Sequence, residues 1–80
     1  MDLNLKTVFD IPLNQIEPDT FSQSDISEIH QKILSEIVAG TLPMDIRDNL
    51  SPFCRLIPAP AHIRSLHEHI LHAHRALQGA

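Results

Sequence analysis

The chain has 80 residues, a formal net charge of −4, 42% hydrophobic residues and 4% aromatic residues. This composition is typical of one small globular domain, and it excludes a large enzyme, a multidomain receptor and a low-complexity chain. The acidic balance argues against nucleic acid as the main partner, because phosphate binding favours a basic face. The single cysteine, Cys54, excludes an internal disulfide. Small domains without disulfides commonly gain stability from a bound metal ion or a partner chain.

The first residues contain neither the basic region nor the apolar run of a secretory signal. No stretch approaches the roughly 18 apolar residues that a membrane span needs. We therefore expect a cytoplasmic protein without a membrane segment, and an unpaired cysteine agrees with that compartment.

Alternating side chains mark residues 3–13. One face carries Leu3, Leu5, Thr7, Phe9, Ile11 and Leu13. Alternation of period two is typical of a β-strand, which Pro12 interrupts late. Because a strand cannot stand alone, it must pair with another chain or lie as an extended arm over helices. We expect an extended N-terminal arm or single strand, with a loop, over residues 1–23, and a helical domain over residues 24–80.

A first long helix is predicted over residues 25–39. Ser22 and Ser24 are candidate N-caps, and the spacing from Ser22 to Asp25 fits a capping box. Gly40 follows as the residue that ends the helix. The apolar stripe of this helix consists of Ile26, Ile29, Ile33, Leu34, Ile37 and Val38.

A second, short helix is predicted over residues 43–50, ended by Ser51 and Pro52. A final long helix is predicted over residues 60–77. Its apolar residues repeat at alternating spacings of three and four, as in two heptads: Ile63, Leu66, Ile70, Ala73 and Leu77. This repeat predicts packing against a neighbouring helix, and we expect the two long helices to pack antiparallel.

These elements define a mainly α domain of two long amphipathic helices and a short one, preceded by an N-terminal arm or strand. The apolar content favours completion by another chain. We expect a non-catalytic interaction or regulatory subunit that acts as a homodimer or docks on a larger protein. The expected partner-binding residues are Ile63, Leu66, Ile70 and Leu77 on the last helix, and Leu5, Phe9 and Ile11 on the arm.

The sequence gives no support for an enzyme. It contains neither a glycine-rich phosphate loop nor a nucleophile elbow, and its acidic residues are too dispersed to predict a carboxylate pair. We expect Cys54 to be a small buried apolar residue. A reactive thiol, with its pKa lowered by Arg55, is the alternative.

Five of the six histidines lie in the final predicted helix. His69 and His72 are three residues apart on it, so both can contact one ion. His30 or Glu28 is a candidate for a further ligand of Zn²⁺, Ni²⁺ or Cu²⁺. The alternatives are solvated histidines that border a packed seam, or a seam that loosens below about pH 6 as they become charged. His30 itself lies within an apolar stripe, where a core histidine bonded to a carbonyl or carboxylate is expected.

A small dimeric DNA-binding regulator or antitoxin is a further alternative. The segment Val8–Pro18 resembles the opening strand of ParB-type partition proteins, and Ile29–Pro43 is similar to the first helix of GntR-type winged-helix regulators. The order of strand, helix and helix is similar to that of ribbon-helix-helix repressors. In the sequence, the basic recognition helix of the GntR type does not follow, and Asp10 and Pro12 occupy the polar face of the predicted strand.

Overall fold

The computed structural model describes residues 4–17 and 19–79, all of whose regular elements are helical. The helices are α1 (Leu5–Phe9), α2 (Gln23–Ala39), α3 (Met44–Leu56) and α4 (Arg64–Gly79). Short 3₁₀ turns occupy Leu13–Gln15 and Ala61–Ile63. The mainly α class predicted from the sequence is thereby confirmed, and no β-strand occurs in the described ranges.

Helix α2 ends at Ala39 as predicted and begins at Gln23, two residues before the predicted start, because Ser22 is the N-cap. The Ser22 hydroxyl accepts a hydrogen bond from the backbone N–H of Asp25 at 3.1 Å, and the Asp25 carboxylate accepts one from the Ser22 backbone N–H at 3.3 Å. This capping box satisfies N–H groups that a first helical turn otherwise leaves unpaired. Gly40 ends the helix with φ of 73°, a left-handed conformation that glycine adopts without strain.

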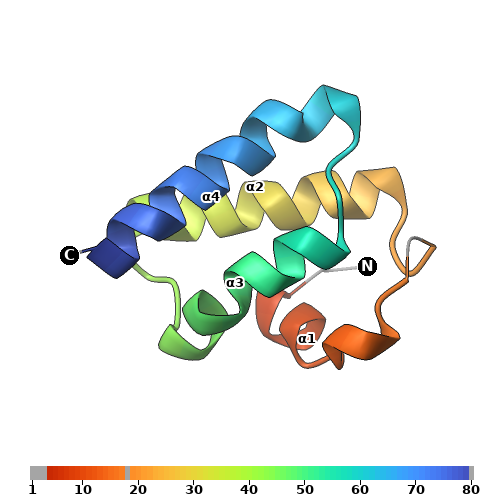
Figure 1. The fold of residues 1–80 in the computed structure, drawn as a ribbon, viewed down its shortest axis with the longest axis horizontal. Helices are drawn as coiled ribbons and strands as arrows, with labels where there is room; N and C mark the ends of the chain where they lie inside the picture. Colours follow the sequence, from red (N-terminus) through yellow and green to blue (C-terminus); the bar gives the residue numbers. More distant parts are fainter. Residues whose placement is uncertain (1–3, 18, 80) are drawn as a thin grey trace.

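The three long helices alternate in direction (Figure 1). Helices α2 and α4 pack side by side and run in the same direction. Helix α3 runs in the opposite direction and connects the end of α2 to the start of α4. The predicted antiparallel packing of the two long helices is therefore wrong. The predicted short helix over residues 43–50 is in fact 13 residues long, and it returns the chain to the starting end of α2 before α4 begins.

Helix α3 continues past the proline that was predicted to end it. It spans 13 residues and contains Pro52 in its interior. The apolar stripe continues on both sides of this proline, with Leu50, Phe53, Cys54 and Ile57 all buried. Pro52 itself is exposed. A proline in the interior of a helix costs about 3 kcal/mol or more, because it removes a backbone hydrogen bond. Burial of the apolar side chains on both sides of Pro52 offsets this cost.

The N-terminal segment is helical where an extended arm or strand was predicted. The Asn4 side chain caps α1 by accepting a hydrogen bond from the Lys6 backbone N–H at 3.0 Å. Leu5 and Val8, three residues apart, are buried on the inner side of this helix. The alternating pattern was thus compatible with a helical stripe too, and the segment contributes to the same core as the later helices. Leu3 lies outside the described residues.

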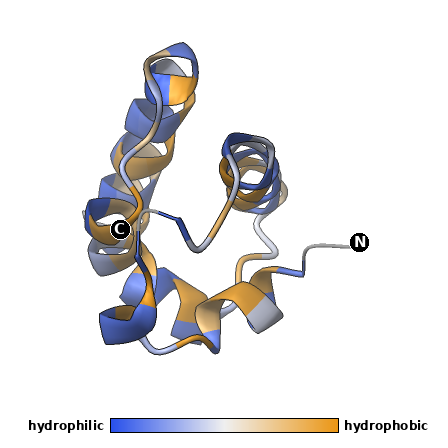
Figure 2. Cartoon of the chain, turned by 90° about the vertical axis from the view of Figure 1, so that its right-hand side faces the viewer, coloured by the Kyte–Doolittle hydropathy of each residue, from blue (hydrophilic) through white to orange (hydrophobic). Residues whose placement is uncertain are grey.

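A single core lies between the helices, whose hydrophobic residues concentrate on their inward sides (Figure 2). Ile33, Leu50, Phe53 and Ile70 have no exposed surface, and the rings of Phe9 and Phe53 stack with centroids 4.4 Å apart. The radius of gyration is 11.8 Å. A globular chain of this length is expected at about 11.6 Å, so the helices close around the core. None of the described helices has the length and apolarity needed to cross a membrane.

We predict that Ile70→Ala lowers the free energy of unfolding by about 2–5 kcal/mol, because it leaves a cavity at a fully buried position. Val38→Ala is the control: Val38 is 80% exposed, although the sequence pattern placed it in the apolar stripe, and a change within about 0.5 kcal/mol is expected. Urea unfolding followed by circular dichroism measures both. Equal effects of the two substitutions would contradict the packing of α4.

Candidate metal centre

Three side chains that can bind a metal ion meet at the junction of the three long helices. His30 comes from α2, Cys54 from α3 and His67 from α4. One ligand atom of each lies within 4.8 Å of the other two. In the described part of the chain this is the only group of three histidine, cysteine or acidic residues close enough to hold one ion.

The same apolar stripes that build the core place these residues. His30 follows the buried Ile29 on α2, and Cys54 follows the buried Phe53 on α3. Both are therefore directed inward, with exposures of 0% and 3%. His67 lies at the flank of the α4 stripe and is half-buried. The expected burial of His30 and Cys54 is confirmed. The expected carbonyl or carboxylate partner of His30 is wrong, because its Nε2 contacts the ring of His67.

The two histidines of this group are in direct contact. Nδ1 of His67 and Nε2 of His30 are 3.4 Å apart, and the rings meet edge to face with centroids 5.0 Å apart. In the protein without an ion, a ring N–H of one donates to the bare nitrogen of the other. Two imidazole nitrogens on one tetrahedral zinc, at about 2.0–2.1 Å from it, are separated by about 3.3–3.4 Å. The observed spacing therefore fits either a hydrogen bond or shared coordination.

Burial keeps the group uncharged near neutral pH. Desolvation, reinforced by repulsion from His67, lowers the pKa of His30 from 6.5 to about 4. Desolvation raises the pKa of the Cys54 thiol from 9.0 to about 12. It also lowers the pKa of His67, against the opposing attraction of Glu68. The centre thus presents two neutral imidazoles and a thiol, and a bound cation would favour the thiolate.

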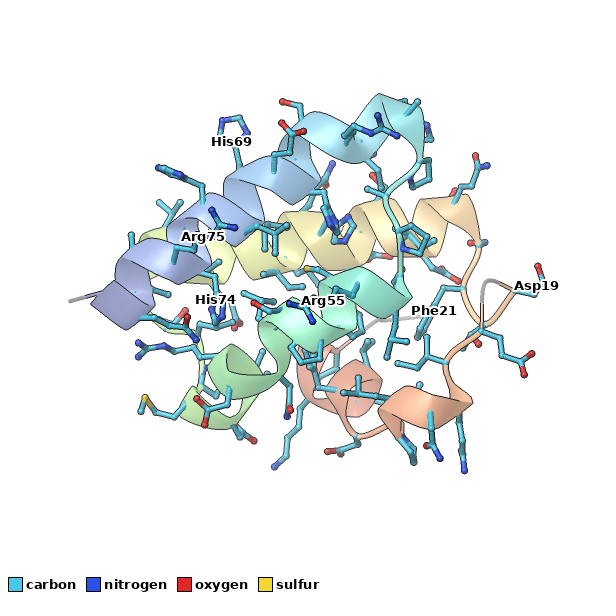
Figure 3. The ribbon with its side chains drawn as sticks, viewed as in Figure 1. Asp19, Phe21, Arg55, His69, His74 and Arg75 are labelled. Atoms are coloured by element: carbon cyan, nitrogen blue, oxygen red, sulfur yellow. The ribbon has the colours of Figure 1, made fainter. Side chains whose placement is uncertain are left out.

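A second buried histidine lies outside this group. His74 of α4 is 2% exposed and points toward the core side of its helix (Figure 3). Its Nδ1 and the Nδ1 of His30 have no hydrogen-bond partner among the described residues. Arg47 closes the neighbouring end of α4 by donating a hydrogen bond to the backbone carbonyl of Leu77 at 3.3 Å.

The histidines that the sequence indicated as metal ligands are not part of the centre. His69 and His72 are both exposed. Nδ1 of His69 lies 2.8 Å from the backbone carbonyl oxygen of Ser65, to which its N–H donates. In the described chain, no third ligand joins them into a metal-binding group. His30, which the sequence suggested as an additional ligand, pairs with His67 instead.

The predicted partner-binding residues contribute to the chain's own core. The buried ones are Leu5, Ile63 and Ile70, and the half-buried ones are Phe9, Ile11, Leu66 and Leu77. Their apolar surface is thus largely covered by helices of the same chain. A contact with a second chain through these residues stays a prediction.

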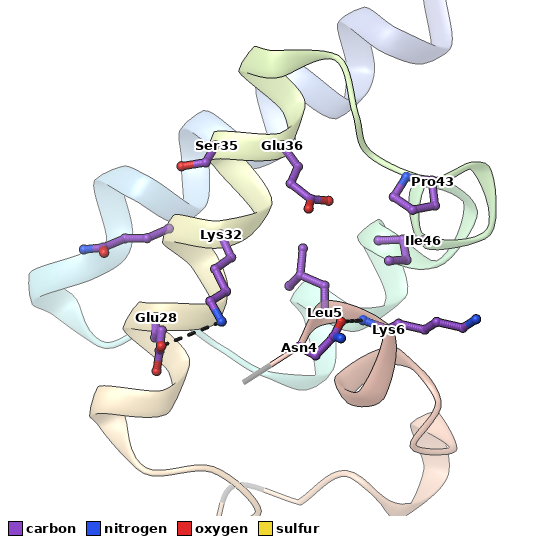
Figure 4. Close-up of a pocket in the computed structure, with 10 residues that line it drawn as sticks. Asn4, Leu5, Lys6, Glu28, Lys32, Ser35, Glu36, Pro43 and Ile46 are labelled. Atoms are coloured by element: carbon purple, nitrogen blue, oxygen red, sulfur yellow. Dashed lines mark hydrogen bonds and ion pairs between the residues drawn. The ribbon is translucent and has the colours of Figure 1, made fainter. Parts of the chain in front are cut away.

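An open groove of about 740 Å³ lies where α1, α2 and α3 meet (Figure 4). Leu5 and Ile46 supply its apolar side. Glu28 and Lys32 form an ion pair along its edge, with 3.8 Å between Oε1 and Nζ. Its lining includes neither histidine nor cysteine, so the group of His30, Cys54 and His67 lies outside this groove.

The sequence contained one signal for the centre that the pattern analysis did not use. Leu50, Phe53, Cys54 and Ile57 follow the spacing of a helical stripe, which places Cys54 inside the bundle if the helix continues through Pro52. The direction of α4 relative to α2, which brings His67 to His30, had no such signal.

We compared the chain with protein-family models, curated proteins and solved structures, and nothing matches it.

We predict that the ion-free protein loses stability as the pH falls from 6.5 toward 4. In that window the unfolded chain protonates His30, whereas the folded chain, with its lowered pKa, does not. The stability contributed by the neutral ring is therefore fully present above pH 6.5, and about 3 kcal/mol of it is lost by pH 4. Neutral Cys54 and half-buried His67 face this ring, and protonation of His67 adds to the loss.

Urea unfolding in chelator at pH 7.0, 6.0 and 5.0 measures this loss. His30→Gln removes the titration and should have a flatter pH profile than the wild type, while His72→Gln, at an exposed position, keeps the wild-type profile. Parallel profiles for all three proteins would show that His30 is not held neutral by burial.

Proposed function

We propose that the chain is a metal-binding helical protein in which one Zn²⁺ ion joins α2, α3 and α4. The observation that carries this proposal is the convergence of His30, Cys54 and His67, one from each long helix, at a largely buried point. The proposal replaces the ligand pair His69 and His72 with this group and keeps zinc as the ion.

The donor set suits zinc. Imidazole nitrogen and thiolate sulfur are the ligands that zinc prefers, and it binds them at about 2.0–2.1 Å and 2.3 Å in tetrahedral geometry. The contact of 3.4 Å between the histidine nitrogens already matches the separation of two such ligands. Small side-chain movements would bring the sulfur into the same coordination sphere, since all three ligand atoms already lie within 4.8 Å.

Binding would stabilise the fold through linkage. The ligands come from three helices, so the unfolded chain does not hold them together. An ion that binds only the folded state adds about 2.7 kcal/mol of stability at a free concentration of 100 times Kd. For an 80-residue domain without a disulfide, this is a large fraction of the total. Coordination also releases the thiol proton, so uptake should weaken as the pH falls.

We predict that the untagged, chelator-treated protein takes up one Co²⁺ or Zn²⁺ per chain. Co²⁺ reports the site directly, because thiolate coordination gives an ultraviolet charge-transfer band and tetrahedral geometry gives intense visible bands. Zn²⁺ should displace Co²⁺ and raise the midpoint of thermal unfolding. Native mass spectrometry gives the stoichiometry.

Matched variants assign the ligands. Cys54→Ala should abolish the charge-transfer band, and both Cys54→Ala and His67→Gln should weaken binding by about 100-fold or more, beyond the 10–100-fold typical of a lost outer-shell partner. The double variant His69→Gln, His72→Gln is the control and should bind as the wild type does. Loss of binding in the control alone would assign the ion to the exposed pair, and absence of uptake by the wild type would refute the proposal.

A further inference from the structure

A small pocket opens directly beside the proposed metal centre. It encloses about 220 Å³ between α3 and α4. Its lining consists of Ser51, Cys54, Arg55, His67, Leu71 and Arg75. This volume is sufficient for a small anion together with several water molecules.

The lining is strongly positive. Arg55 and Arg75 supply two guanidinium groups from facing helices, and both side chains lie on the α3–α4 side of the molecule (Figure 3). No carboxylate is among the lining residues, and neither arginine forms an ion pair with a described residue. Guanidinium groups bind carboxylates and phosphates through paired, charge-assisted hydrogen bonds. The Ser51 hydroxyl adds one more donor.

The pocket also shares two lining residues with the proposed centre. Cys54 and His67 line it, whereas His30 does not. Three protein ligands leave a fourth tetrahedral position of zinc open. His30 is fully buried and does not line the pocket, so Cys54 and His67 are the two candidate ligands that border it.

We propose that this pocket binds a small oxyanion, a phosphate or a carboxylate, which supplies the fourth ligand to the metal ion. The inference rests on the proposed function, because it requires the ion. One thiolate leaves a Zn²⁺ centre with a net charge of about +1, and the two arginines add to it, so an anion is favoured over water at that position. Oxygen ligation by a small anion completes the tetrahedron without a fourth protein side chain.

One carboxylate opposes the anion. Glu68 lies next to His67 and one helical turn before Leu71, outside the pocket lining but close enough to attract a proton to His67. Its negative charge should repel an incoming anion, so Glu68→Gln should bind the anion more tightly than the wild type does. The arginine variants should instead bind the anion more weakly. Opposite changes in affinity would show that charge, and not loss of packing, determines the effect of each substitution.

The experiment uses the full untagged chain loaded with Co²⁺, and metal uptake is recorded before any anion is added. Sodium phosphate and sodium acetate are then titrated separately. The visible cobalt bands report replacement of the fourth ligand, and the relaxation of ³¹P or of the acetate protons reports proximity of the anion to the ion. The variants Arg55→Gln and Arg75→Gln should each weaken anion binding by about tenfold, the loss of one charge-assisted contact. Arg64→Gln, on α4 but outside the pocket, should bind as the wild type does.

Binding of either anion with this arginine dependence supports the inference, and the anion that binds identifies the oxyanion as phosphate or carboxylate. Normal cobalt uptake without any response to anions, or an equal response in all three arginine variants, overturns the inference and leaves the proposed function standing. Failure to take up cobalt refutes the proposed function, and the inference falls with it. Circular dichroism confirms that each variant is folded.

Discussion

The rest of the structure depends on how a histidine is accommodated in an apolar core. His30 has no exposed surface, and its Nε2 lies 3.4 Å from Nδ1 of His67. A buried polar group without a partner costs about 1–3 kcal/mol, so this contact favours one register of α4 against α2 over its alternatives. Cys54, which reaches the same point from α3, connects the third helix to that register.

The contact requires the order of helix directions that the structure shows. In an antiparallel pair, His67 near the start of α4 would lie beside the C-terminal part of α2, away from His30. The 13 residues of α3 prevent antiparallel packing of α2 and α4, because they return the chain to the starting end of α2 before α4 begins (Figure 1). The stripe that holds α3 together across Pro52 therefore determines which histidine meets His30, although Pro52 itself lies at the surface.

Local signals in the sequence were sufficient to predict α2, its capping box and most of α4, since these depend on nearby residues. They were insufficient where the nearby residues were compatible with two different secondary structures. Residues 5–9 fit both a strand and a short helix, and Pro52 outweighed a stripe that tertiary burial later favoured. For the centre, His30 and Cys54 were predictable as buried residues. Their meeting with His67 depends on long-range packing, which no spacing along the chain encodes.

The residue types in the centre are more consistent with ion binding than with a role in core packing alone. An apolar side chain at His30 or Cys54 would fill the same space without placing a nitrogen or sulfur ligand inside the core. Buried polar groups generally stabilise a fold less than well-packed apolar ones unless all of them are satisfied. Here three helices each direct one nitrogen or sulfur ligand to the same point. An ion at that point would be bound by all three ligand atoms and would cross-link the three helices.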